Sequence, residues 1–254
     1  MKRLVILAGA LVLSMSLMTG CQSKEKERLS FRETGIEQMG SGDYEEAIAS
    51  FDQALDRSKG MVGNFELDVL KYRAEAEYKA EDYDAAAHTY DILLEVDGEK
   101  PEYLNLRCLS RSAAGQLDGA LEDFTRAYAL DKEAVGAKEA LLSLGSALEG
   151  AGRSEDAKAL YETALSNGTE NSEIYNRLGL CMLEQENYDQ ALRYFEQGIA
   201  AGGQEALAKL YFNQAVTYEY KGEFSKALEL FERYNSTYGP DEQADREIAF
   251  LRTR

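Results

Sequence analysis

The feature that most constrains the fold of this chain is an alanine that recurs at nearly constant spacing. The recurrences are 39, 34, 37, 34 and 36 residues apart, and an aromatic residue follows each alanine by four positions. The pairs are Ala47/Phe51, Ala86/Tyr90, Ala120/Phe124, Ala157/Tyr161, Ala191/Phe195 and Ala227/Phe231. A period in this range indicates repeated supersecondary units, because a single unit of that size cannot bury its apolar face alone.

Two more positions recur upstream of each alanine. A small residue lies twelve positions earlier, at Gly35, Ala74, Cys108, Gly145, Gly179 and Ala215. A bulky apolar residue lies four positions before that, at Phe31, Leu70, Leu104, Leu141, Tyr175 and Tyr211. Small side chains let two helices approach closely, and bulky ones fill the space around the contact. We interpret all of these positions as packing residues of helix hairpins.

This pattern resembles the tetratricopeptide repeat, a helix–turn–helix unit of about 34 residues, over residues 28–239. The resemblance implies an all-α fold, a right-handed superhelical solenoid of about six helix hairpins. Composition agrees, since the chain has only 2 prolines and no tryptophan, and its abundant Ala, Leu, Glu and Lys favour helix. Gln38 and Glu77 stand where the family prefers apolar residues, so we expect a slipped register or a looser fit in the first two repeats.

The same repeat pattern also predicts the turns between helices and the end of the last repeat. Gly42, Gly115 and Gly222 suit the turn inside a hairpin, where the backbone needs a positive φ. Residues 58–64 and 201–204 read as longer loops. The last segment, residues 240–254, is expected to hold a capping helix from Pro240 to Arg252 that covers the terminal repeat through Ala244, Ile248 and Leu251.

The N-terminus reads as a targeting segment. Lys2 and Arg3 precede an uncharged apolar run of 15 residues, Leu4 to Met18. As a helix this run would span roughly 22 Å, short of the roughly 30 Å hydrocarbon core of a bilayer. We therefore expect residues 1–20 to be a signal peptide rather than a membrane-spanning helix.

The residues that follow, Met18-Thr19-Gly20-Cys21, resemble the bacterial lipobox, with Met18 in place of the usual leucine. The resemblance implies that Cys21 is lipidated (palmitate among the acyl chains), with residues 21–27 as the lipidated cysteine and a short tether. The protein is then a lipoprotein of the cell membrane or outer membrane that faces the extracytoplasmic side. Gln22 favours the outer membrane in a two-membrane cell. An ordinary signal peptide or an uncleaved anchor are the alternatives.

The net charge of the chain limits the classes of partner that it can bind. The chain carries a net charge of −18, which repels nucleic acid and anionic headgroups. Residues 40–100 hold 16 acidic and 6 basic residues, a net charge of −10. This acidic segment reads as a solvated helix face or, alternatively, as a docking surface for a basic partner.

The residues needed for catalysis or cofactor binding are missing. The chain has 1 histidine, His88, with no companion for a metal site or a triad, and no glycine-rich phosphate loop. Cys108 and Cys181 lie in different repeats and read as small buried residues. We therefore expect no enzyme activity, no cofactor and no metal.

The resemblance also implies where a ligand binds, namely a groove lined by the first helix of each hairpin. The candidate groove residues are Arg32, Lys71, Tyr72, Tyr78, Asn105, Asn176, Arg177, Phe212, Asn213 and Tyr220. The paired Lys and Asn that family members use to hold a peptide C-terminus are incomplete here. The mixture of aromatic, aliphatic and basic residues instead suits an amphipathic peptide or a helix of a protein partner.

Together, these expectations predict a lipid-anchored scaffold or adaptor that binds a protein or peptide at the bacterial cell envelope. Its plan resembles that of tetratricopeptide lipoproteins that serve pilus secretins or outer-membrane protein insertion. Two other functions remain open: a self-associating module, and an accessory subunit that regulates a cell-envelope enzyme. Fold alone does not distinguish them.

Overall fold

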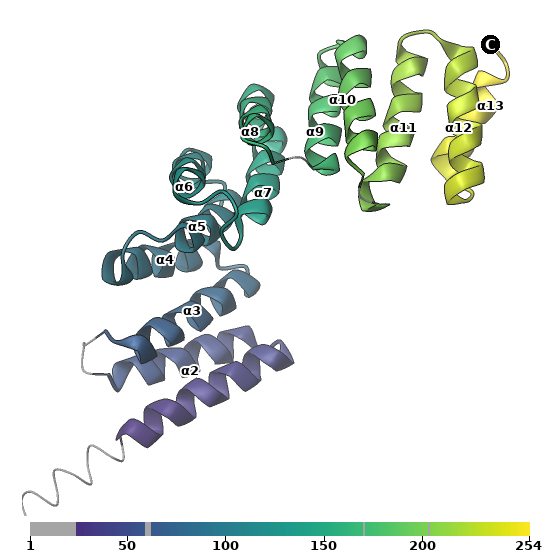
Figure 1. Cartoon of the computed structure of the whole chain (residues 1–254). Helices are drawn as coiled ribbons and strands as arrows, with labels where there is room; N and C mark the ends of the chain where they lie inside the picture. Colours follow the sequence, from purple (N-terminus) through teal and green to yellow (C-terminus); the bar gives the residue numbers. More distant parts are fainter. Residues whose placement is uncertain (1–23, 59–61, 170, 203) are drawn as a thin grey trace, which may run out of the picture. The chain divides into compact units, whose positions relative to one another are not determined.

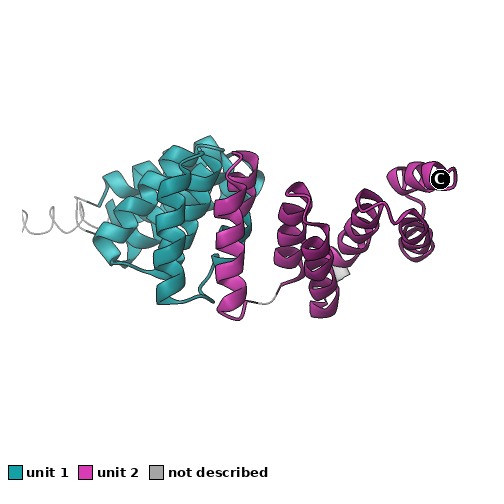
Figure 2. Ribbon diagram, turned by 90° about the horizontal axis from the view of Figure 1, so that it is seen from above, with its two compact units in different colours: residues 1–144 teal, residues 145–254 magenta. Residues whose placement is uncertain are grey.

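The computed structural model describes residues 24–58, 62–169, 171–202 and 204–254. Cys21 and the expected signal peptide lie outside the described residues. The described chain is helical and contains no strand (Figure 1), so the prediction of an all-α repeat fold is confirmed. None of its described helices has the length and apolar composition required to cross a bilayer. The chain divides into two compact units, residues 1–144 and 145–254 (Figure 2).

Unit 1 is a stack of consecutive helices. They are a helix over residues 24–41, α2 (Tyr44–Asp56), α3 (Asn64–Lys79), α4 (Tyr83–Asp97), α5 (Pro101–Ala113) and α6 (Leu117–Leu130). Each of α2 to α5 packs on the helix that follows it. The core clusters of this unit contain the recurring positions: Ala47 and Phe51 are fully buried in one, and the upstream small residue Ala74 is buried with Tyr90 in another. The positions that recur along the sequence are therefore the positions that recur in the buried core.

Unit 2 repeats the same arrangement. The boundary between the units falls within α7 (Ala137–Gly150). The later helices are α8 (Ser154–Ser166), α9 (Ser172–Glu184), α10 (Tyr188–Ala201), α11 (Gln204–Tyr220), α12 (Phe224–Tyr238) and α13 (Glu242–Leu251). The small residues of the first helices lie directly on the aromatic rings, since a Cβ added to Gly179 would be 2.2 Å from Phe195.

The C-terminal helix α13 begins at Glu242, two residues later than the sequence suggests. Asp241 caps it, because its carboxylate accepts hydrogen bonds from the backbone N–H groups of Gln243 and Ala244, both at 2.9 Å. The apolar face that was expected to cover the last repeat is buried in one cluster with Ala227 and Phe231 of α12.

The two polar departures from the family pattern do not disturb the register. Ser50 donates a hydrogen bond to Gln38 (2.7 Å), and Thr89 donates one to Glu77 (2.6 Å). In each pair the partners are twelve residues apart, so both hairpins place them at the same level. A hydrogen bond across the hairpin replaces the apolar contact, and the expected slip is absent.

Candidate functional site

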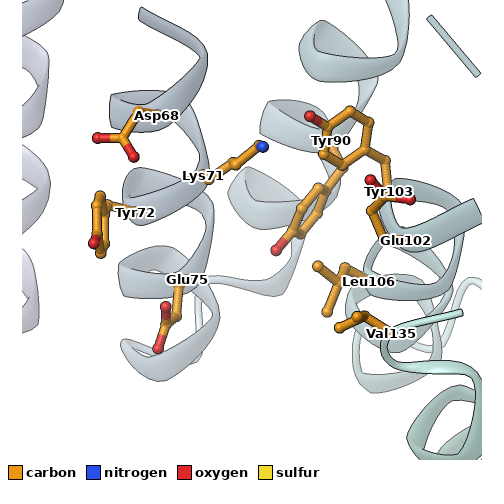
Figure 3. Close-up of a pocket in the computed structure, with 9 residues that line it drawn as sticks. All are labelled: Asp68, Lys71, Tyr72, Glu75, Tyr90, Glu102, Tyr103, Leu106 and Val135. Carbon is orange, nitrogen blue, oxygen red and sulfur yellow. The ribbon is translucent and has the colours of Figure 1, made fainter. Parts of the chain in front are cut away.

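The described part of unit 1 contains a pocket of about 440 Å³ between α3 and α5 (Figure 3). One wall is the exposed face of α3, which contributes Asp68, Lys71, Tyr72 and Glu75. Asp68 and Glu75 each lie three or four positions from Lys71 and Tyr72, the spacing that places side chains on one face of a helix. Two of the predicted groove residues, Lys71 and Tyr72, therefore line this pocket.

The opposite wall comes from α5, from Tyr90 of α4 and from the loop after α6. Its residues from α5 and the loop are Glu102, Tyr103, Leu106 and Val135. Tyr90 and Tyr103 are only 5% and 1% exposed, so they form the floor, whereas Val135 is 74% exposed and lies at the rim. Helix α5 starts at Pro101, which suits the first position of a helix and places Glu102 in its first turn.

The charged groups of this pocket are unevenly paired. Lys71 Nζ lies 5.4 Å from the centre of the Tyr103 ring, whose hydroxyl donates a 2.5 Å hydrogen bond to Asp97. Hydrogen bonds from Lys100 and from Tyr103 lower the pKa of Asp97, while burial and the bond to Asp97 raise the pKa of Tyr103. Lys71 thus belongs to a cluster with Tyr103, Asp97 and Lys100 at one end of the pocket.

The carboxylates on the α3 side have other partners. Asp68 pairs with Arg32 (2.5 Å), and Glu75 pairs with Lys79 (2.9 Å) one turn along α3. Glu102 makes no ion pair with any residue that the structure describes. Basic residues of the fold therefore neutralise two of the three carboxylates that line the pocket.

Arg32 and Tyr72 stabilise the edge of this pocket. The Arg32 guanidinium lies 5.3 Å from the centre of the Tyr72 ring, and that ring also stacks on Phe51 at 5.9 Å. Arg32 itself does not line the pocket. Its charge is held between a carboxylate and an aromatic ring of α3, so its role in the structure is to join the first described helix to α3.

A second pocket, of about 410 Å³, lies in unit 2 between α9 and α11 and the residues around the start of α13. The predicted groove residues that line it are Asn176, Arg177, Phe212 and Asn213. Asn213 Nδ2 donates a 2.8 Å hydrogen bond to Asn176 Oδ1, which joins the two first helices across the pocket. Four predicted residues from two successive hairpins are thus gathered at one place.

Charges in the unit 2 pocket are balanced. Arg177 pairs with Glu149 (2.8 Å) and with Glu173 (3.1 Å). Lys209 and Asp241 also line the pocket. Its two basic residues and two acidic residues cancel, so this pocket has no net charge. The Phe212 ring packs edge-on against Tyr234 (5.5 Å), which supplies an apolar wall.

Three other predicted residues lie elsewhere. Asn105 is 1% exposed, and its amide donates a 3.1 Å hydrogen bond to the Val135 carbonyl, so it holds the loop after α6. Tyr78 packs edge-on against Tyr83 near the end of α3 (5.2 Å). Tyr220 is 66% exposed and stacks on Tyr188 (6.4 Å) at the end of α11. None of the three lines either pocket.

Several pocket residues were not anticipated as groove residues. Tyr90 is the recurring aromatic of a second helix and was assigned to packing alone. Tyr103 and Tyr234 fall outside the recurring positions, and Val135 comes from a loop. Tyr103 precedes the bulky first position of its repeat by one residue, so a search of both flanks of that position would have found it.

The described chain contains no group of three or more His, Cys, Asp or Glu side chains arranged to hold a metal ion. Cys108 and Cys181 are free and buried, as expected. Burial raises the pKa of the Cys108 thiol to about 12 and that of Cys181 to about 11, so both thiols stay protonated and unreactive near neutral pH.

The chain consists of stacked helix hairpins with a period near 34 residues, and its pockets lie between the first helices of successive hairpins. These features define a helical-repeat protein. Family models described as tetratricopeptide repeat match residues 38–107 and, in overlapping segments, residues 107–172, 142–206 and 182–241. The chain belongs to the tetratricopeptide repeat family. Proteins of this family generally mediate protein–protein interactions and scaffolding, and their fold is typically non-catalytic.

Several solved structures share this fold. PilF of Pseudomonas aeruginosa has a TM-score of 0.56 at 15% identity, covering 91% of this chain and 99% of its own. MamA has a TM-score of 0.54 at 23% identity, with 64% and 92% covered. A tetratricopeptide repeat protein from Parabacteroides merdae has a TM-score of 0.51 at 18% identity, with 98% of each chain covered. At these identities the similarity concerns the fold alone.

The chain is also similar in sequence to curated proteins. The peroxisomal targeting signal receptor of Yarrowia lipolytica is 32% identical over 96 residues, which is 37% of this chain. The matched segment spans 15% of the receptor's length. The similarity is therefore confined to a stretch of repeats.

Proposed function

We propose that this protein is a lipid-anchored adaptor, which holds a protein partner at the outer side of a bacterial membrane. The partner presents a peptide segment to the first helices of the hairpins, and lipid on Cys21 keeps the complex at the membrane. The repeat fold supplies the binding surface, and the sequence around Cys21 supports the anchor. A lipidated cysteine with two or more acyl chains gives stable anchoring, whereas a single chain is marginal.

One observation supports the binding part most directly. Residues chosen from first-helix positions line a hollow in each unit, Lys71 and Tyr72 in one and Asn176, Phe212 and Asn213 in the other. Each hollow combines aromatic side chains with groups that donate or accept hydrogen bonds. Such a combination suits a peptide, because its side chains need apolar contacts and its backbone needs polar ones.

The binding test is a pull-down from detergent-solubilised membranes with the full chain as bait, read by mass spectrometry. We expect Tyr72→Ala and Asn213→Ala to reduce the recovered partner while the far-UV circular dichroism stays unchanged. His88→Ala is the control, because His88 is exposed on α4 outside both pockets. Equal recovery with both pocket variants would move the binding surface away from the first helices.

The identity of the captured protein separates the alternatives. Recovery of a tagged second copy of the same chain would indicate self-association, and light scattering of the purified protein would then show an oligomer. Recovery of a cell-envelope enzyme whose activity changes on binding would indicate an accessory subunit. Recovery of a non-enzymatic envelope protein is the result that the adaptor function predicts.

The anchor has its own test. We expect Cys21→Ala to release the protein from the membrane fraction into the soluble extracytoplasmic fraction, because the lipid attachment site is lost. Metabolic labelling with a palmitate analogue should mark the wild type and not the variant. A Cys21→Ala protein that stays membrane-bound as firmly as wild type would contradict the proposed lipid anchor.

A further inference from the structure

We infer that the C-terminal helix α13 is a pH-sensitive strap, whose docking completes the unit 2 pocket and becomes weaker as the pH rises. This inference rests on the proposed function, which makes the pocket a peptide site, and it adds a regulation of that site. Its basis is the position of α13 at the pocket, the contacts that hold α13 in place, and a contact between the carboxyl groups of Glu219 and Glu247 across the interface of α11 and α13.

The unit 2 pocket takes part of its wall from the start of α13. Asp241 and Gln243 line the pocket on this side. The Asp241 carboxylate accepts hydrogen bonds from the backbone N–H groups of Gln243 and Ala244, both at 2.9 Å, so its position depends on the first turn of the helix. Helix α13 has 10 residues, and an isolated helix of that length is marginal in water. This wall of the pocket is therefore formed only while α13 is docked.

The contacts that dock α13 are apolar side chains and exposed polar pairs. Helix α13 packs on α12 (Figure 1). Its apolar face lies in one buried cluster with side chains of α12, and consists of Ala244, Ile248 and Leu251. At the surface, Asn235 donates a hydrogen bond to Asp245 (2.7 Å), and Arg252 pairs with Glu232 (2.8 Å). Exposed ion pairs add little stability, so a change in one further contact shifts α13 between its docked and undocked states.

That further contact joins α13 to α11. Glu219 is half-buried in the last turn of α11, and its carboxyl group shares a hydrogen bond with the carboxyl group of Glu247, which precedes the buried Ile248. A hydrogen bond between two carboxyl groups requires a proton on one of them, because a carboxylate is an acceptor only. With the proton, the pair links the two helices. Without it, two like charges face each other in a partly buried site.

The surroundings of Glu219 favour the protonated form. Burial raises the pKa of this carboxyl, and the charge of Glu247 and the hydrogen bond with it raise the pKa further. No other charged or titratable group in the described part of the chain acts on it. Arg246, beside Glu247 on α13, is exposed. Lys221, two residues after Glu219, is held at 2.9 Å by two other carboxylates, those of Asp189 and Glu223.

The sign of the pH dependence follows from the two states of the strap. When α13 leaves, Glu219 loses both its burial and the neighbouring Glu247, so the docked chain binds this proton more tightly than the undocked chain does. The contribution of the pair to docking is fully present below the ordinary glutamate pKa of about 4.3, and it is lost as the pH rises through the raised pKa of the docked state. Acid pH therefore closes the strap, and a higher pH loosens it.

Hydrogen exchange of the α13 amides in the full chain measures docking. Wild type and Glu247→Gln are compared at the same pH, so that the pH dependence of the exchange chemistry cancels. We expect the protection of the variant relative to wild type to increase by about twofold or more between about pH 4 and about pH 7. The reason is that the glutamine amide donates to the Glu219 carboxylate without a titrating proton.

Two further substitutions assign the effect to this contact. Glu219→Gln should give the same increase, and the double variant should give no larger one, since either change alone removes the pair of like charges. The matched control is Glu242→Gln, which removes one charge from an exposed position in the first turn of the same helix. It should show no increase, because a negative charge at a helix N-terminus is favourable.

A fluorescent reporter connects the strap to the pocket. The chain has no tryptophan, so Tyr234→Trp places a single indole in the pocket wall, where the Tyr234 ring packs against Phe212 (5.5 Å). We expect its emission to move to longer wavelength as the pH rises, and to stay constant when Glu247→Gln is added. Tyr128→Trp, in α6 outside the pocket, is the control reporter and should not respond.

Three outcomes overturn the inference. They are a relative protection that stays constant or falls with pH, an increase that Glu242→Gln reproduces, and a loss of α13 protection that leaves the Tyr234→Trp emission unchanged. Failure of the adaptor function looks different. A helix α13 that responds to pH in a chain that captures no protein from membranes keeps the strap, whereas a captured partner with an α13 that ignores pH keeps the adaptor alone.

Discussion

Gly179 lies where α9 crosses the Phe195 ring of α10. A Cβ at this position would be 2.2 Å from Cε1 of the ring, closer than any real contact. The equivalent first-helix position in another hairpin of unit 2 is Ala215, buried with Phe231, so the hairpins differ in how closely their two helices approach. At Gly179 the approach is as close as the absence of a side chain allows.

We expect Gly179→Ala to lower the free energy of unfolding by about 1–3 kcal/mol, the usual range for overpacking a core. Gly40→Ala is the control, because Gly40 is helical and nothing lies within 4 Å of its added Cβ. That substitution should be stabilising by about 0.5–1 kcal/mol through helix propensity. Urea unfolding measures both, and equal effects of the two changes would contradict the close contact.

Glu77 is a buried carboxylate whose pKa departs from its ordinary value. Burial raises its pKa, and the hydrogen bond from Thr89 and the charge of Arg73 offset only part of that rise. The folded chain therefore binds this proton more tightly than the unfolded chain does. The contribution of Glu77 to stability is fully present below the unfolded pKa and is lost as the pH rises through the folded pKa.

The measurable consequence is a pH-dependent difference between wild type and Glu77→Gln. The free energy of unfolding of the wild type, minus that of the variant, should fall as the pH rises above the ordinary glutamate pKa of about 4.3, because glutamine does not ionise. Glu95→Gln, at an exposed position, should show no such trend. A difference that rises with pH would mean that the Arg73 charge outweighs burial.

At the scale of the element, the turn inside each hairpin has a common backbone conformation. Gly42, Gly115 and Gly222 have φ between 75° and 86°, and the same turn position holds Glu81 (φ 62°) and Glu186 (φ 57°) in two other hairpins. The left-handed conformation costs a residue with a Cβ about 1–2 kcal/mol. The turn is thus imposed by the packing of the two helices, and glycine is the residue that accepts it without strain.

Ion pairs join successive hairpins at a repeated level. Arg73 of α3 reaches Asp52 of α2 (2.7 Å), and Arg107 of α5 reaches Asp91 of α4 (2.6 Å), 34 residues later. Arg107 also contacts Asp123 of α6, which is fully buried. One arginine therefore holds three helices together, and a buried carboxylate depends on it.

We expect Arg107→Ala to lower the free energy of unfolding by about 3 kcal/mol or more, because Asp123 would then keep only Arg111 as a partner in a buried site. Arg126→Ala is the matched control, since Arg126 forms an exposed pair with Glu99 (2.9 Å) and such pairs contribute about 0–1 kcal/mol. Chemical denaturation compares the two variants. Similar losses of unfolding free energy in the two variants would show that the burial of Asp123 does not increase the cost of removing its partner.

At the scale of the whole molecule, the contacts are sequential. Within each unit, the helices that pack most extensively are neighbours in the sequence, and α9 and α11, which also pack, are two apart. In such a chain the stability is close to a sum of repeat and nearest-neighbour terms. Damage to one hairpin should therefore remain local, unlike damage to a protein with a single closed core.

Ile248→Ala tests this locality. Ile248 of α13 is 8% exposed in the cluster that also contains Phe231, and its truncation should cost about 2 kcal/mol or more. Hydrogen exchange should become faster in α11 to α13 and stay unchanged in α3 to α5. Phe250→Ala, at a side chain that is 40% exposed, should leave both regions nearly unchanged. Uniformly faster exchange throughout the chain would contradict sequential packing.

The sequence by itself determined the repeat, the helices and the packing pairs. Gly179 and Phe195 are 16 residues apart, as are Ala74 and Tyr90, so one hairpin brings each pair together and its spacing is visible in the chain. The all-α repeat fold follows from these local pairs, and the burial of Cys108 and Cys181 follows with it. The prediction that first-helix residues bind a ligand depends on family resemblance and awaits the experiments above.

Only the tertiary structure decided which of these residues meet in a hollow. Asn105 and Asn176 hold the same position in their repeats, yet Asn105 is turned to the Val135 carbonyl while Asn176 lines a pocket. The unit 1 pocket joins residues from Asp68 to Val135, contributed by three helices and a loop. Such a hollow depends on the stacking distance between hairpins and on where each side chain finds its partner, and neither is encoded in the spacing of one repeat.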